Sequence, residues 1–142
     1  MTIRLIQTYR ATDSIVDWLA RLVGIIAEIE EWRELTPTST PPLINSWDNV
    51  GGALTTAAFY IDPYQIVRLK GSVDTGASGT VAFVLPVGYR PPAQMTFTAQ
   101  NIGGGPGPGG TSYITIAANG NVTLTVSGAG DISMDAVSFR AL

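Results

Sequence analysis

The stretch Gln65–Val73, QIVRLKGSV, alternates between two sets of side chains. In an extended chain, successive side chains point to opposite faces of the sheet. One face therefore carries Val67, Leu69, Gly71 and Val73, and the other carries Ile66, Arg68, Lys70 and Ser72. This pattern predicts a strand with one face in a protein core and the other face toward solvent.

The same alternation recurs in both directions from this stretch. Further predicted strands are Phe59–Asp62, Gly79–Pro86, Gln94–Gln100, Ser112–Ala117, Asn121–Gly128 and Asp131–Leu142. Asp62-Pro63 marks a turn, and Asn119-Gly120 predicts a tight hairpin. The apolar phase slips between Met134 and Val137, which predicts a bulge or a break. About seven short strands at this spacing predict an antiparallel β-sandwich or jelly roll.

The stretch Ile15–Trp32, IVDWLARLVGIIAEIEEW, has a helical rather than a two-residue period. Its apolar residues follow alternating steps of three and four, as in a coiled-coil seam. The seam consists of Ile15, Trp18, Leu22, Ile25, Ile29 and Trp32. Ser14 and Asp17 resemble a capping box at the start, and Thr36-Pro37 ends the pattern. One amphipathic helix is expected here.

This helix has two possible partners. It could pack across the sheet of its own chain, or it could pack against copies of itself. The apolar stripe is wide, and the Pro-rich segment 36–42 reads as a stiff spacer that holds the helix away. Ile or Leu at the first seam position with Ile at the other favours trimers or higher assemblies over dimers. The pattern therefore favours a trimeric coiled-coil stem.

Four segments are expected along the chain of 142 residues. Residues 1–11 form an N-terminal arm that could anchor the protein in a larger assembly. Residues 12–35 form the helical stem and residues 36–42 form the linker. Residues 43–142 form the β-sandwich head.

Composition excludes several kinds of chemistry. The chain has no cysteine and no histidine, so disulfides, thiolate metal sites, histidine ligands and a catalytic triad are excluded. A net charge of −3 with no basic cluster argues against nucleic acid as a partner. No export signal and no membrane-spanning segment is predicted, and no metal or other cofactor is expected. Paired carboxylates, such as Asp131 and Asp135, are what remains for hydrolysis.

Binding is a better expectation than catalysis. Aromatic rings beside neutral polar groups in turns suit weak binding of sugars. The best cluster joins Trp47 to Asp48 and Asn49, followed by Tyr89 with Arg90. The candidate ligand-binding residues are Trp47, Asp48, Tyr64, Tyr89, Arg90 and Asn101, and no catalytic residue is assigned.

The segment Tyr60–Pro92 resembles a pattern in the head domains of bacteriophage tail-fibre and receptor-binding proteins. These heads have a D-P-x-x-x-V-x-L-x-G strand, a short turn, and then F-x-L-P-x-G-Y-R-P. The matching residues are Asp62, Pro63, Val67, Leu69, Gly71, Phe83, Leu85, Pro86, Gly88, Tyr89, Arg90 and Pro91. The ending, ANGNVTLTV and DAVSFRAL, is similar to the final hairpin and last strand of the family.

The resemblance implies a trimeric, jelly-roll-like head on a helical stem. It implies a non-enzymatic virion protein, assembled in the host cytoplasm, that attaches the phage to a saccharide on the host surface. Its other partners would be virion proteins bound through the arm. Two alternatives stay open: a purely structural capsid or fibre-attachment protein, and a small glycan hydrolase.

Overall fold

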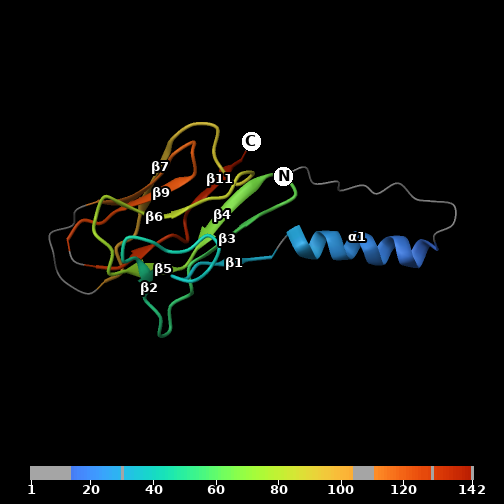
Figure 1. The fold of residues 1–142 in the computed structure, drawn as a ribbon, viewed down its shortest axis with the longest axis horizontal. Helices are drawn as coiled ribbons and strands as arrows, with labels where there is room; N and C mark the ends of the chain where they lie inside the picture. The colour runs from blue at the N-terminus through green and yellow to red at the C-terminus, as the bar shows by residue number, and fades with distance from the viewer. Residues whose placement is uncertain (1–13, 30, 104–110, 129, 142) are drawn as a thin grey trace.

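The computed structural model describes residues 14–29, 31–103, 111–128 and 130–141, with only the backbone of 25–29. One helix, α1 (Ile15–Ile29), precedes a mainly β domain (Figure 1). The strands are β1 (Arg33–Glu34), β2 (Asp48–Asn49), β3 (Ala58–Ile61), β4 (Ile66–Lys70), β5 (Ser72–Asp74), β6 (Thr80–Val84), β7 (Met95–Ala99), β8 (Ser112–Ile116), β9 (Asn121–Thr125), β10 (Ile132–Ser133) and β11 (Ser138–Arg140). The predicted N-terminal arm, 1–11, lies outside the described residues.

The strands form three antiparallel sheets, each of which we name after a central strand. The β4 sheet has the order β1-β3-β4-β11, the β5 sheet has the order β10-β5-β2, and the β9 sheet has the order β6-β9-β8-β7. Phe59 on β3 stacks with Phe83 on β6, their ring centroids 6.4 Å apart. Phe97 on β7 lies 6.3 Å from Phe139 on β11. The β4 and β9 sheets therefore pack face to face, which confirms the predicted sandwich.

Alternation places the core as the sequence predicts. Val67 and Leu69 on β4 are buried, whereas Arg68 between them is exposed. On β9, Val122 and Leu124 are fully buried on the side that faces the other layer. Turn chemistry is also as expected, because Gly120 adopts a positive φ of 94° in the hairpin between β8 and β9.

The predicted strand Gln65–Val73 is divided at Gly71. This residue has φ 91°, and it separates β4 in one sheet from β5 in another. The segment of this chain that pairs with β4 and β5 is interrupted at the same level, between β11 and β10. There the Met134 amide donates to the Gly71 carbonyl at 2.9 Å, and the Gly71 amide donates to Asp135 Oδ1 at 2.7 Å. The phase slip predicted between Met134 and Val137 is this change of sheet.

The helix is shorter than predicted. It ends at Ile29, and Arg33–Glu34 pairs with β3 as an edge strand. Leu35 is fully buried, and its amide donates to the Ala57 carbonyl at 2.7 Å. Trp32 therefore belongs to the head and not to the helical seam. Helical spacing placed Trp32 in the stem, because a sequence pattern contains no information about the contacts of its ring with Tyr60 and Lys70.

The Pro-rich segment 36–42 is a turn within the head and not a spacer before it. The Ser39 and Leu43 amides both donate to the Thr36 carbonyl, and the Thr36 amide donates to Ser39 Oγ at 2.8 Å. Leu35 before the turn and Leu43 after it are both buried. The predicted start of the head at residue 43 therefore moves toward the N-terminus, to the residues that follow the end of α1 at Ile29.

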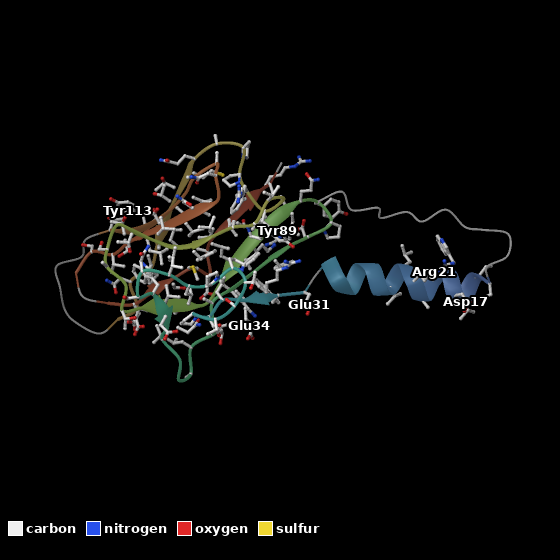
Figure 2. All side chains as sticks on the ribbon, viewed as in Figure 1. Asp17, Arg21, Glu31, Glu34, Tyr89 and Tyr113 are labelled. Carbon is white, nitrogen blue, oxygen red and sulfur yellow. The ribbon has the colours of Figure 1, made fainter. Side chains whose placement is uncertain are left out.

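Helix α1 projects from the end of the head at which β1 begins (Figure 1). The side chains of Asp17 and Arg21 lie on this projecting segment, while Tyr113 lies toward the opposite end of the head (Figure 2). Apolar side chains of the helix remain exposed: Ile15 by 64%, Val16 by 74% and Val23 by 63%. The described side chains of the helix, up to residue 24, therefore do not pack across the sheet of their own chain.

Candidate ligand-binding face

The outer face of the β4 sheet carries basic and aromatic side chains. Arg68 on β4 lies opposite Tyr60 on β3 and opposite Ser138 on β11. Alternation along β4 and β11 puts Lys70 and Arg140 on this outer face as well. We call Trp32, Tyr60, Arg68, Lys70, Ser138 and Arg140 the basic face.

Trp32 is held on this face by two contacts. Its ring lies 4.4 Å from the Tyr60 ring in an edge arrangement, with an angle of 60° between the planes. The Lys70 Nζ atom stands over the Trp32 ring, 4.3 Å from its centroid. This distance is within the range of a cation–π interaction. The chain between α1 and β1 is thereby fixed to the outside of the sheet.

A depression of about 390 Å³ opens beside Trp32. It is lined by Trp32, Arg68, Leu69, Lys70, Asp135, Ala136, Val137 and Ser138. Its volume is at the lower end of the range for small-molecule sites. We call it the Trp32 pocket. It combines one aromatic ring, two cations, one hydroxyl group and the carboxylate of Asp135.

Three carboxylates lie on or beside the basic face. Glu34 is exposed on β1 and shares the face of Lys70, since both lie opposite Ala58. The other two, Asp135 and Asp62, accept hydrogen bonds within the fold. Asp135 Oδ1 accepts the Gly71 amide, and its Oδ2 accepts the Ser133 hydroxyl at 2.9 Å. Asp62 Oδ1 accepts the amides of Tyr64 and Ile66, both at 2.9 Å, and so closes the turn between β3 and β4. Asp135 thus has a structural role at the sheet change, which explains its place in the sequence without catalysis.

The basic residues of the head are concentrated on one face. Residues 43–142 contain four basic residues, and three of them are on the basic face. The fourth, Arg90, donates from Nε to the Leu85 carbonyl at 2.8 Å. At the β5 sheet, Asp48 lies opposite Asp74, and Asp131 is close enough to act on Asp74. Burial first, and then the charges of Asp131 and Asp48, raise the pKa of Asp74 above its ordinary value of 3.8.

Replacing Asp74 with asparagine is expected to raise the unfolding temperature slightly at pH 7. The carboxylate form is disfavoured in the folded state, so folded Asp74 binds its proton more tightly than the unfolded chain does. Its penalty is present above the raised pKa and disappears as pH falls below the ordinary value. Melting curves of both proteins from pH 3 to 7 should therefore converge at the acid end. A constant difference across this range would contradict the expectation.

Two of the aromatic candidates from the sequence are buried. Trp47 is only 2% exposed, and its Nε1 donates to Thr80 Oγ1 at 2.9 Å. Tyr89 is 6% exposed, lies edge-on to Phe59, and has the Arg33 guanidinium 5.2 Å from its ring centroid. Both rings therefore contact other residues of this chain and are largely buried. Aromatic side chains near turns are often core residues, and these two are examples.

The other four candidates are dispersed. Tyr64 is 79% exposed in the turn between β3 and β4. Asp48 is exposed on β2, and Arg90 lies in the loop after β6. Asn101 connects two loops, because its Nδ2 donates to the Ser127 carbonyl at 3.0 Å and its Oδ1 accepts the Gly103 amide at 3.2 Å. The six candidates belong to four separate segments of the head.

Sequence reasoning did not select the residues of the Trp32 pocket. The alternation of Gln65–Val73 did place Arg68 and Lys70 on the outward face. Trp32 was assigned to the helix, and Ser138 carried no signal of its own. The pairing of β11 with β4 brings Ser138 to Arg68, and this pairing joins segments about 70 residues apart.

No described helix is long and apolar enough to cross a membrane. Within the same part of the chain, no group of three or more acidic, histidine or cysteine side chains could hold a metal ion.

Comparison with known proteins supports the fold. A solved structure, the receptor binding protein of Listeria phage PSA, superposes with a TM-score of 0.58 over 91% of this chain and 80% of that chain. The two sequences are 14% identical over the alignment. No family model and no curated protein matches this chain. The chain therefore has the fold of a phage receptor-binding protein.

Proposed function

We propose that this protein is a phage virion component that attaches the particle to a saccharide on the host surface, as a homotrimer and without enzymatic activity. The observation that carries the proposal is the fold. The likeness covers 91% of the chain. The described residues of the head make up a smaller share of the chain, so the aligned part extends beyond the β-sandwich. The motif Phe83–Pro91 and the final hairpin point to the same class of head from the sequence.

The exposed stripe of α1 supports self-association. Ile15, Val16 and Val23 are all more than half exposed, which costs free energy in water unless the helix has a partner. An isolated helix of 15 residues is marginal, so packing against equivalent helices would stabilise it. Three copies of α1, with Ile15, Leu22 and Ile29 at one seam position and Trp18 and Ile25 at the other, would form a stem below three heads. The side chains of Ile25 and Ile29 lie outside those described.

A trimer of heads suits a weakly bound ligand. A single shallow site for a sugar is expected to bind with low affinity, and linked sites increase the apparent affinity by about 10² to 10⁴. The host surface presents many copies of the same saccharide, so such a trimer can engage several at once. Residues 1–11 would hold the trimer on other virion proteins.

Binding of the fluorescently labelled full chain to a panel of bacterial strains tests this function. We expect saturable binding to a subset of strains, and loss of binding after mild periodate oxidation of their surface sugars. Binding that survives oxidation would contradict a saccharide receptor. A chain that forms trimers but binds no strain would instead favour the structural role in the capsid or fibre.

A further inference from the structure

We propose that the Trp32 pocket binds an acidic saccharide, a sugar unit that carries a phosphate or carboxylate group. This inference rests on the proposed function, because it names the site and the ligand class through which attachment would occur. It differs from the sequence-based candidates, none of which lines the pocket.

The charge of the basic face argues for an anionic ligand. The protein is acidic overall, with a net charge of −3, yet three of the four basic residues in 43–142 lie on this face. Asp48 and Asp131 lie near Asp74 at the β5 sheet, where burial first and then these two charges raise the pKa of Asp74. At the basic face, by contrast, the carboxylates of Asp62 and Asp135 accept hydrogen bonds of the fold. An approaching anion is therefore attracted locally to Arg68 and Lys70 in the Trp32 pocket and repelled at the β5 sheet.

Arg68 is available to contact a ligand. Its side chain is 49% exposed, and its Nη2 lies 3.9 Å from Asp62 Oδ2, which is too long for a hydrogen bond. Asp62 meanwhile accepts two backbone amides in its own turn. The guanidinium group thus keeps donors with the fork geometry that matches a phosphate or carboxylate group.

The rest of the pocket suits a sugar ring. Trp32 supplies an aromatic side chain at one wall, Ser138 supplies a hydroxyl group, and Lys70 adds a second cation beside the ring. A volume of about 390 Å³ is sufficient for one or two sugar units. Because Trp32 lies between α1 and β1, the pocket is formed jointly by the head and the chain that leaves the stem.

The test compares three polymers that share one backbone: dextran, carboxymethyl dextran and phosphorylated dextran. Binding of the full chain to each is measured by surface plasmon resonance, alongside adsorption to a bacterial strain that the wild-type protein binds. We expect tighter binding to one or both acidic dextrans than to dextran, and weaker binding at high salt. The carboxymethyl and phosphorylated polymers distinguish the two anionic groups.

The variant Arg68→Gln is expected to weaken both acidic-dextran binding and cell adsorption by about tenfold, as for loss of a charge-assisted contact. Arg33→Gln is the matched control, because it removes the same charge from an exposed residue outside the pocket. Equal losses in both variants, equal binding to all three dextrans, or unchanged adsorption by Arg68→Gln would overturn the assignment. In those cases adsorption by the wild-type protein would leave the attachment function standing, whereas failure to adsorb to any strain would remove both proposals.

Discussion

Replacing Gly71 with alanine is expected to lower the free energy of unfolding by about 3 kcal/mol or more. Gly71 has φ 91°, a conformation that side chains other than glycine rarely adopt. A Cβ atom there would lie 2.4 Å from the Thr56 carbonyl oxygen and 2.5 Å from the Ala57 amide nitrogen. The change therefore combines backbone strain with a steric clash.

The clash is difficult to relieve because both sides of it are held by hydrogen bonds. The Ala57 amide donates to Asn49 Oδ1 at 2.6 Å, and the Ala57 carbonyl accepts the Leu35 amide. Gly71 itself is joined to Asp135 and Met134. A shift of either segment would break contacts that connect β1, β3 and the change between sheets, so the strain cannot be spread at low cost.

Urea denaturation of Gly71→Ala, followed by tryptophan fluorescence, measures the loss. Gly79→Ala is the matched control, since Gly79 has φ 80° but no heavy atom within 4 Å of an added Cβ. The control should lose only about 1 kcal/mol, from backbone strain alone. If the two variants lost the same stability, the close approach to Thr56 would not be important and the argument would be wrong.

Gly71 also illustrates how far the sequence can be read. The alternation in Gln65–Val73 predicted the buried and exposed faces of β4, because a two-residue period follows directly from extended backbone geometry. It could not predict that the strand changes sheets at Gly71. That change depends on a segment more than 60 residues away, Met134 and Asp135, which bends at the same level. Local patterns contain no information about such a pairing.

The end of the helix was missed for a related reason. Trp32 continues the helical spacing that begins at Ile15, so the pattern alone extends the helix to it. In the structure, the Trp32 ring contacts Tyr60 and Lys70 on the head instead of the helical seam. Leu35, which lies two residues after the start of β1, is buried in the head. Tertiary burial therefore overrides helical propensity at this junction. The Trp32 pocket was missed for the same reason. It forms only when β11 pairs with β4 and the Trp32 ring packs on the sheet.

Replacing Leu22 with aspartate is expected to convert the proposed full-length trimer into a monomer and to reduce apparent affinity for host cells by about 10² to 10⁴. Leu22 is at the centre of the predicted seam on α1, so three aspartates would meet at the helical interface. Burying three like charges without partners costs more than a short coiled coil can supply. The head should be unaffected, because α1 projects away from it (Figure 1).

Light scattering gives the mass, and adsorption to a susceptible strain gives the affinity. Ala20→Asp is the matched control, because Ala20 is exposed and is at the position of the heptad farthest from the seam. It introduces the same charge into the same helix and should leave both readouts unchanged. A trimer that persists in Leu22→Asp would place the main subunit contacts in the heads. A wild-type monomer would mean that the exposed stripe of α1 has a different partner, and attachment could then not depend on three linked sites.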